Sequence, residues 1–128
     1  ETEAVVPRIK NDLLTLFEAV AYGKLNEHKI SVDPRTTVTV MLVSGGYPGD
    51  FEKGKVISGM EACEGSLLFH AGSSVKENNV VTSGGRVIAI TSFGTSIAEA
   101  LEISMRNAEA IQYEGKYYRR DIGKDLLT

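Results

Sequence analysis

VVTSGGRVIAITSFGTSIAEALEISMRNAEAI, residues 80–111, is the stretch of sequence that decides the fold. Two runs rich in β-branched residues, 80–83 and 86–92, stand on either side of the Gly84–Gly85 pair. Glycine adopts positive φ angles without steric cost, which suits a tight turn between antiparallel strands. The first half of the stretch therefore predicts a β-hairpin with these two glycines at its tip.

The second half changes from strand to helical periodicity after Gly94. Ser96 and Glu99 have the spacing of a capping box, in which the two side chains satisfy free backbone N–H groups at the start of a helix. Apolar residues then recur on one face, namely Ile97, Leu101, Ala108 and Ile111. This pattern predicts an amphipathic helix to about residue 111 that covers the strands.

Further strands are predicted on both sides of this stretch. Residues 36–43 alternate Val and Leu with Thr and Met, which is the period of a half-buried strand. Shorter strands are expected at 55–59, at 66–71 and in the tail after residue 113. Hairpin strands followed by one covering helix predict an α+β fold with antiparallel pairing.

The N-terminal part is predicted to contain a second amphipathic helix, at 11–25. Asn11 is the expected N-cap and Gly23 the expected end of the helix. Its apolar face consists of Leu13, Leu16, Phe17 and Val20.

The composition limits the classes of function. The chain has 128 residues, of which 42% are hydrophobic and 24% charged, as in an ordinary globular domain. Its net charge of -3 makes nucleic acid and anionic membranes poor partners, and no apolar run approaches the roughly 18 residues of a membrane span. Cys63 is the single cysteine, so no internal disulfide can form. We expect a cytoplasmic protein with no metal-ligand cluster.

Residues 44–55, SGGYPGDFEKGK, come close to the phosphate-binding pattern G-x-x-x-x-G-K-[ST]. Gly49, Gly54 and Lys55 fit the pattern, but Val56 stands where a hydroxyl should hold magnesium. Two carboxylates also lie inside the loop, where they would repel phosphates. We therefore expect no nucleotide here, and the loop is either a connection or part of a ligand cleft that presents Tyr47.

Gly84, Gly85 and Arg86 form the first candidate binding site. Successive glycines expose backbone N–H groups, and the adjacent guanidinium can bind a phosphate or carboxylate through two hydrogen bonds. The alternative is a hairpin turn whose arginine is merely solvated.

The tail and one histidine provide further candidates. Arg119 and Arg120 lie beside two tyrosines, although neighbouring residues of a strand point to opposite faces and would not grip one ligand together. A surface strand paired with nearby carboxylates explains them as well. His70 ends an apolar strand before a glycine, where it either faces a cleft or simply caps the strand.

Five motifs, taken in order, resemble the C-terminal region of the phosphoribosylamine–glycine ligase family. They are SGGYPGDFEKGKVI (44–57), FHAGS (69–73), VVTSGGRVIAIT (80–91), AEAL (98–101) and YYRRDIG (117–123). The opening ETEAVVPRIKNDLL (1–14) resembles the segment that leaves the ATP-grasp domain of that family. The resemblance implies an ATP-grasp C-terminal lobe of the hybrid-motif type at 31–128, preceded by the end of the ATP-grasp domain and a linker helix at 1–30.

The family resemblance also implies a reaction. ATP, glycine and 5-phosphoribosylamine would give glycinamide ribonucleotide, ADP and phosphate in purine biosynthesis, with magnesium on the ATP phosphates. The N-terminal and ATP-grasp lobes are missing from this sequence, so the chain would be an inactive C-terminal fragment that binds no ATP or magnesium by itself and is expected to self-associate through helix 11–25. The alternative is a stand-alone binding module for a phosphorylated metabolite.

The resemblance points to substrate contacts rather than to catalytic residues. The residues it implies are Ser44, Gly45, Gly46, Tyr47, His70, Ala71, Gly72, Gly84, Gly85, Arg86, Arg119 and Arg120. Lys10 and Asp12 stand at the junction with the missing lobe, where a helix start explains them equally well.

Overall fold

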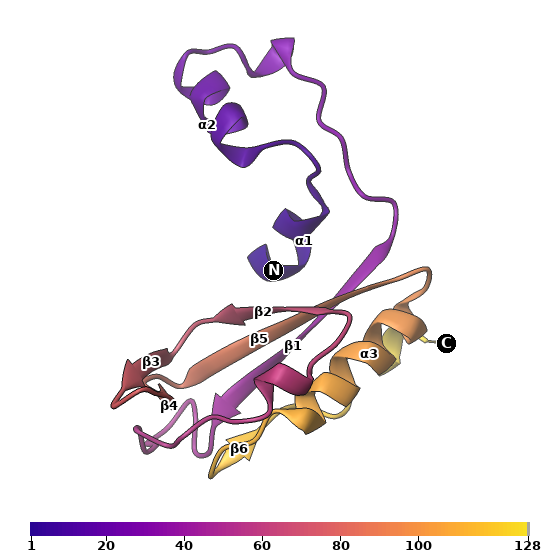
Figure 1. The fold of residues 1–128 in the computed structure, drawn as a ribbon. Helices are drawn as coiled ribbons and strands as arrows, with labels where there is room; N and C mark the ends of the chain where they lie inside the picture. The colour runs from indigo at the N-terminus through magenta and orange to yellow at the C-terminus, as the bar shows by residue number, and fades with distance from the viewer. Residues whose placement is uncertain (128) are drawn as a thin grey trace.

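A computed structural model describes residues 1–127 and confirms the α+β class (Figure 1). An antiparallel four-stranded sheet has the order β2-β5-β1-β6, and a separate two-stranded sheet joins β3 to β4. The strands are β1 (Thr36–Ser44), β2 (Ser66–His70), β3 (Ser73–Lys76), β4 (Asn79–Thr82), β5 (Arg86–Gly94) and β6 (Lys116–Tyr117). The helices are α1 (Thr2–Val5), α2 (Leu13–Ala21) and α3 (Ile97–Ala110), with short 3₁₀ turns at Val6–Arg8, Leu25–Glu27, Met60–Ala62 and Lys124–Leu126.

The core lies between α3 and one face of the four-stranded sheet (Figure 1). Leu42 of β1 pairs with Ile88 of β5, and both side chains are completely buried. Ala108 and Ile111, at the end of α3, pack against them. Burying a large aliphatic side chain contributes roughly 1.5–3 kcal/mol, so these contacts hold the helix on the sheet.

The predicted capping box is confirmed at the start of α3. Ser96 Oγ accepts a hydrogen bond from the Glu99 backbone N–H at 3.2 Å, and the Glu99 carboxylate accepts from the backbone N–H of Thr95 at 2.7 Å. Hydrogen bonds from the Thr95 hydroxyl and N–H lower the pKa of Glu99. The helix therefore begins where the sequence predicts.

A buried polar seam fixes the position of α3 on the sheet. Asn107 donates to Glu64 O at 2.8 Å and to Ser66 Oγ at 2.6 Å. One turn earlier, Ser104 Oγ bonds Ser92 Oγ at 2.7 Å and Val38 O at 2.9 Å. Because buried polar groups are costly without partners, these bonds select one register of the helix on the strands.

The predicted hairpin at Gly84–Gly85 is wrong. Strand β4 pairs with β3, and the turn between them is Glu77–Asn78, where both residues have positive φ. Gly84 and Gly85 instead link β4 to β5 across the two sheets and do not have positive φ. The sequence SSVK of β3 has little apolar character, so its pairing gave no periodic signal.

Three other boundaries differ from the predictions. Residues 55–59 form two isolated bridges, Val56 to Val81 and Ser58 to Gln112, and not a strand. Helix α2 is shorter than predicted, and Asp12, rather than Asn11, caps it by accepting from the Leu14 N–H at 2.8 Å. Gly23 ends this helix with a φ of +67°, as expected. The tail strand is only two residues long.

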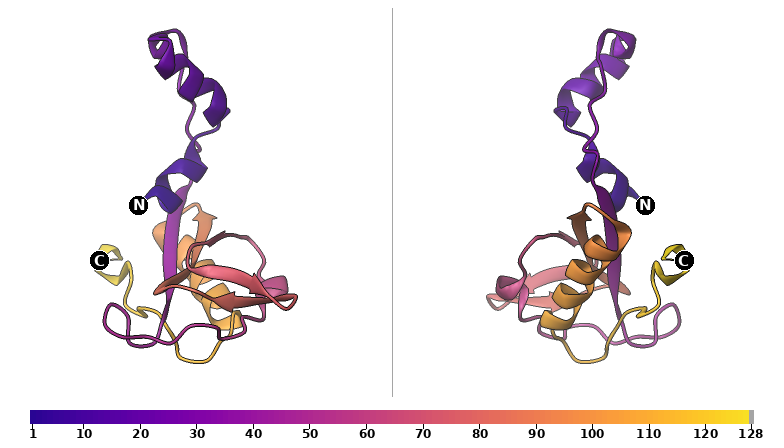
Figure 2. Two further views of the ribbon diagram at one scale, coloured as in Figure 1. Left: turned by 90° about the vertical axis from the view of Figure 1, so that its left-hand side faces the viewer. Right: turned by 90° about the vertical axis from the view of Figure 1, so that its right-hand side faces the viewer.

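Residues 1–35 form an arm that projects from the sheet (Figure 2). Its first turn lies on the sheet, where Thr37 donates to Ala4 O at 2.7 Å and Thr91 to Glu3 O at 2.9 Å. Farther out, α2 exposes Leu14, Phe17 and Val20 to between 57% and 66%. No helix within residues 1–127 is both long and apolar enough to cross a membrane.

Candidate functional site

Two glycine motifs that are distant in sequence lie back to back at one end of β5. The Gly72 N–H donates to Arg86 O at 2.6 Å, and Gly72 O accepts from the N–H groups of Ser83 and Gly84. A Cβ atom on Gly72 would lie 2.4 Å from Arg86 O and 2.7 Å from the Gly84 Cα. Glycine is required here because the two backbones touch.

The loop that follows β1 reaches the same place. Ser44 donates its backbone N–H to Gly85 O at 2.8 Å and its hydroxyl to Gly84 O at 2.9 Å. The ring of Tyr47 covers Gly85, since a Cβ atom there would lie 2.0 Å from a ring carbon. The structure therefore brings together the three glycine-containing motifs that the sequence singled out.

A β-bulge decides where the Arg86 side chain goes. Leu42 pairs with Ile88, but the next residue, Val43, pairs with Arg86, so Val87 is an extra residue on β5. Antiparallel partners share a face, and Val43 lies on the face opposite to Leu42. The bulge thus turns Arg86 away from α3. We call this second side of the sheet, with Thr39, Met41 and Val43, the open face.

The N-terminal arm places a carboxylate on this side of the sheet. Glu3 belongs to α1, and its carbonyl is bound by Thr91 of β5. A hydrogen bond from its own backbone N–H is the main cause that lowers the pKa of Glu3, the N-terminal ammonium comes next, and the positive charge of Arg86 makes the smallest contribution. Sequence reasoning missed Glu3, because no local pattern shows that the first turn folds back over β5.

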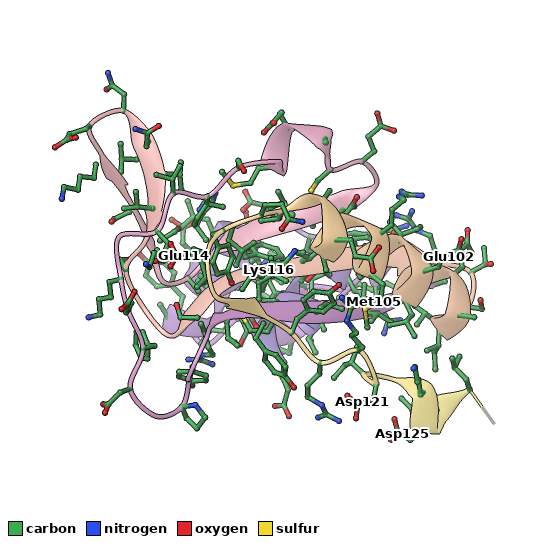
Figure 3. The ribbon with its side chains drawn as sticks, turned by 90° about the horizontal axis from the view of Figure 1, so that it is seen from below. Glu102, Met105, Glu114, Lys116, Asp121 and Asp125 are labelled. Carbon is green, nitrogen blue, oxygen red and sulfur yellow. The ribbon has the colours of Figure 1, made fainter. Side chains whose placement is uncertain are left out.

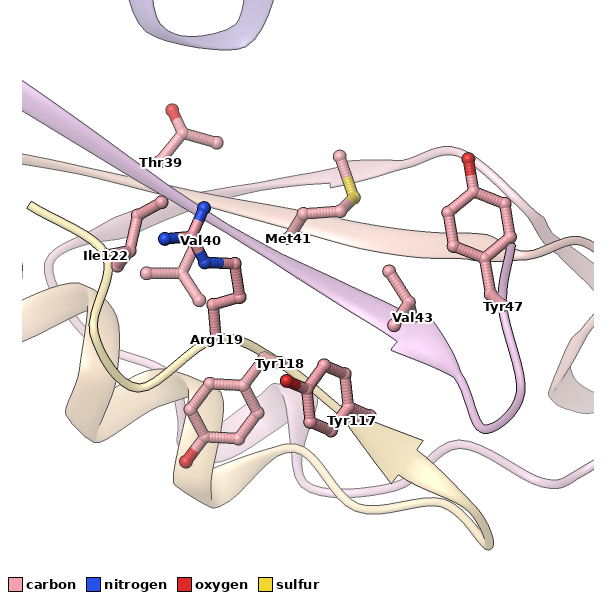
Figure 4. A pocket seen from close by; sticks show the side chains of 9 residues that line it. All are labelled: Thr39, Val40, Met41, Val43, Tyr47, Tyr117, Tyr118, Arg119 and Ile122. Carbon is pink, nitrogen blue, oxygen red and sulfur yellow. The ribbon is translucent and has the colours of Figure 1, made fainter. Parts of the chain in front are cut away.

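A cavity of about 260 Å³ opens at the β1 edge of the open face (Figure 4). Met41 and Val43 form its floor, and the Tyr47 and Arg119 side chains flank it from opposite ends. Arg119 is exposed and pairs with Asp121 at 2.9 Å. A mostly apolar cavity with one cation and several aromatic rings suits a small organic anion.

The two arginines of the tail diverge, as their neighbouring positions predicted. Arg119 lines the open-face cavity, whereas Arg120 turns toward α3, bonds Glu109 at 3.3 Å and lies 5.2 Å above the Tyr118 ring. Lys116 also serves the helix: its ammonium donates to Ala108 O and Ile111 O at the C-terminal end of α3 (Figure 3). Burial there lowers the pKa of Lys116.

His70 lies on the opposite side of the sheet from Arg86. It pairs with Ile88, whose side chain faces α3, and its Nδ1 is 2.7 Å from Ser73 Oγ. The neighbouring Ala71 N–H is already used, because it donates to Val87 O at 3.0 Å. The FHAGS turn therefore shapes the site through the backbone of Gly72 rather than through the imidazole.

Gly46 offers a free backbone donor beside this cluster. The residue is exposed, and within residues 1–127 its N–H group donates no hydrogen bond. Free N–H groups in loops are common anion contacts. Lys10 and Asp12 lie on the arm, where Asp12 serves as the cap of α2. Across the described residues no group of three or more His, Cys, Asp or Glu side chains could hold a metal ion.

Comparisons with known proteins show the family to which this chain is similar. Residues 37–125 match the family described as "Phosphoribosylglycinamide synthetase, C domain". The chain is 44% identical over 122 residues to the phosphoribosylamine–glycine ligase of Caldanaerobacter subterraneus subsp. tengcongensis, with 95% of this chain covered. It is also 44% identical over 125 residues to the ligase of the same name from Pseudomonas aeruginosa, with 96% covered.

A solved structure of phosphoribosylamine–glycine ligase from Thermotoga maritima superimposes on 82% of this chain with a TM-score of 0.68 and 34% identity. The chain covers 27% of that structure and 29% of each of the two curated relatives. It thus corresponds to less than a third of their length. The match over residues 37–125 shows that the chain belongs to the family of phosphoribosylglycinamide synthetase C domains.

Proposed function

We propose that this chain is the C-terminal, substrate-side part of a longer phosphoribosylamine–glycine ligase. The whole protein would join glycine to 5-phosphoribosylamine and convert ATP to ADP and phosphate, in purine biosynthesis and in the cytoplasm. The relatives' names and the alignment over 95–96% of this chain support the activity. Residues 1–30 would be the end of an ATP-grasp domain and linker helix, and residues 31–128 the C-terminal domain.

The share of the site that this chain supplies is the binding of the ribose phosphate. The observation that carries this proposal is the β-bulge at Val87, because it turns Arg86 from the core side to the open face. A buried bulge that re-aims one charged residue is a feature expected next to a binding site. A guanidinium can hold a phosphate dianion through two charge-assisted hydrogen bonds, and Arg119 adds a second cation on the same face.

Several other features would complete the phosphate site. The free N–H group of Gly46 can donate to a phosphate oxygen, and Ser44 fixes Gly84 and Gly85 beside Arg86. Glu3 adds a negative charge on the same side of the sheet as Arg86. Arg120 and His70 would be peripheral, since their side chains turn toward α3.

The chemical step itself belongs to the upstream lobes in this proposal. Glycine would be activated as an acyl phosphate, which the amine of phosphoribosylamine then attacks, releasing phosphate. ATP and magnesium would be bound there. Residues 1–127 contain no metal-ligating cluster, so no step is assigned to a metal on this chain. The role left to the chain is to hold the sugar phosphate so that its amine meets the activated glycine.

The exposed arm suggests how the chain joins those lobes. Leu14, Phe17 and Val20 form an apolar face on α2 that no other part of the described chain covers. Exposed apolar faces of this kind are normally interfaces. In the longer protein this face would pack on the ATP-grasp lobe, and in the isolated chain it would favour self-association.

The test is ADP formation by the full-length protein with each substrate omitted in turn. The proposal expects ADP only when ATP, glycine and phosphoribosylamine are all present, together with glycinamide ribonucleotide as product by mass spectrometry. The present chain alone should show neither product. ADP formation that is indifferent to phosphoribosylamine would contradict the proposed activity.

A further inference from the structure

Tyr47 occupies an unusual position between two parts of the chain. Its ring lies so close to Gly85 that a Cβ atom there would meet three ring carbons at 2.0, 2.5 and 3.0 Å. The three atoms nearest to this position all belong to the ring, so the ring leaves no room for a side chain at position 85. An edge contact with Phe51, with ring centroids 6.1 Å apart, holds the other side of the ring.

The same ring lines the open-face cavity. Tyr47 and Arg119 flank that cavity from opposite ends (Figure 4). Gly85 immediately precedes Arg86 in the chain, so the Tyr47 ring touches both the segment that carries Arg86 and the space in front of Arg119. The ring of Tyr47 makes the contact with Gly85, and the same side chain lines the cavity.

We propose that Tyr47 is a positioning residue that clamps the Gly84–Arg86 segment and so fixes where the Arg86 guanidinium lies on the open face. This inference rests on the proposed function and names the ligand of Arg86 as a sugar phosphate. Ser44 anchors the backbone of the segment through two hydrogen bonds, and Tyr47 presses on its surface. An Arg86 segment freed from the ring would lose the preorganisation that affinity requires.

The first test needs no substrate. Amide hydrogen exchange of peptides that contain residues 83–87 is measured in the full-length protein for wild type, Tyr47→Phe and Tyr47→Ala. Tyr47→Ala should exchange at least about tenfold faster there, since local opening follows lost contacts, while Tyr47→Phe keeps the wild-type rate. Equal rates in all three proteins overturn the clamp, whatever reaction the protein catalyses.

The second test pairs Tyr47 with two glycines. Gly85→Ala should raise the KM for phosphoribosylamine about tenfold because its methyl group collides with the ring, and adding Tyr47→Ala should cause no further loss. Gly72→Ala is the matched control. A methyl group at position 72 collides with Arg86 O and not with the Tyr47 ring. The increases in the KM for phosphoribosylamine caused by Gly72→Ala and Tyr47→Ala should therefore multiply in the double variant.

The KM for ATP separates positioning from general damage. It should stay within about twofold of wild type in Tyr47→Ala. If ADP formation by the wild-type protein does not require phosphoribosylamine, the proposed function is refuted. The amide hydrogen exchange of residues 83–87 then still tests whether Tyr47 clamps the Gly84–Arg86 segment. An active wild type with multiplicative Gly85→Ala and Tyr47→Ala defects would refute the clamp alone.

Discussion

Arg86 of β5 lies opposite Val43 of β1, although Ile88, two residues farther along β5, lies opposite Leu42, the immediate neighbour of Val43. A step of one residue along β1 therefore corresponds to a step of two residues along β5. Val87 takes up the difference and is completely buried in the core. A regular strand would place the Arg86 side chain on the α3 side with Ile88 and Ile90. The face of the sheet onto which Arg86 projects depends on this single irregularity in an otherwise regular ladder.

The tail arginines give the first prediction, because they face different sides. Arg119→Ala removes a cation from the open-face cavity and should raise the KM for phosphoribosylamine in the full-length protein about tenfold, as for loss of one charge-assisted contact. Arg120→Ala is the control, since it removes an exposed pair with Glu109 and the contact with the Tyr118 ring on the α3 side. Steady-state kinetics of both variants checks this. A larger defect in Arg120→Ala than in Arg119→Ala would move the site to the α3 side.

The polar seam under α3 gives a stability prediction. Asn107→Ala removes a buried side chain and leaves the partly buried acceptors Glu64 O and Ser66 Oγ without their donor, which should lower the free energy of unfolding by about 1–3 kcal/mol. Urea denaturation of the chain measures the free energy of unfolding. Glu102→Ala, on the exposed side of the same helix, should change this free energy by less than about 0.5 kcal/mol. Equal effects of the two changes would mean that the seam does not hold the helix.

The capping box predicts a dependence on acid pH. The pKa of Glu99 is lowered from its ordinary value of 4.5 by hydrogen bonds from Thr95, so the unfolded chain binds more protons than the folded chain just below that pH. The stabilisation is present above pH 4.5 and is lost as the pH falls through the folded-state pKa. Glu99→Gln cannot titrate there. The stability difference between wild type and Glu99→Gln should therefore shrink on acidification, and a difference that is constant with pH would contradict the assignment.

Helix α2 predicts the behaviour of the isolated chain. Its exposed Phe17 and neighbouring apolar side chains should make the chain associate with itself at high concentration, since nothing in residues 1–127 covers them. Phe17→Glu should reduce this association in sedimentation experiments. Thr15→Glu adds the same charge at another exposed position of the helix and should leave most of the association intact. A wild-type chain that sediments as a monomer at every concentration would show that the face does not self-associate.

The sequence predicted most of the elements, but it predicted neither strand β3 nor the pairing of β3 with β4. The alternation of β1, the capping box of α3 and the apolar runs of β2 and β5 are local signals, and the structure confirms them. The pairing of β3 with β4 was missed because its turn uses Glu77 and Asn78, while the conspicuous Gly84–Gly85 pair suggested a turn. Glycine is needed at these two positions because Gly84 lies against Gly72 and Gly85 lies against the Tyr47 ring, and not because of a positive φ angle.

The candidate site was predictable as a set of motifs and not as a geometry. Ordered motifs indicated that the SGGYPG, HAGS and SGGR segments act together, and the structure brings their backbones into contact. The face onto which each side chain projects depends on register. Without the pairing of β1 with β5, no sequence pattern separates Arg86 from His70, or shows that Glu3 returns to the sheet.

The most direct test of the account is the kinetics of Arg86→Ala in the full-length protein with phosphoribosylamine and ATP varied separately. Loss of a bidentate phosphate contact should reduce kcat/KM for phosphoribosylamine by about 2–4 kcal/mol in free-energy terms, while the KM for ATP hardly changes. Arg86→Lys keeps the charge without the planar fork and should recover only part of the loss. Unaltered phosphoribosylamine kinetics in Arg86→Ala, or a defect confined to ATP, would contradict the assignment of Arg86 to the ribose phosphate.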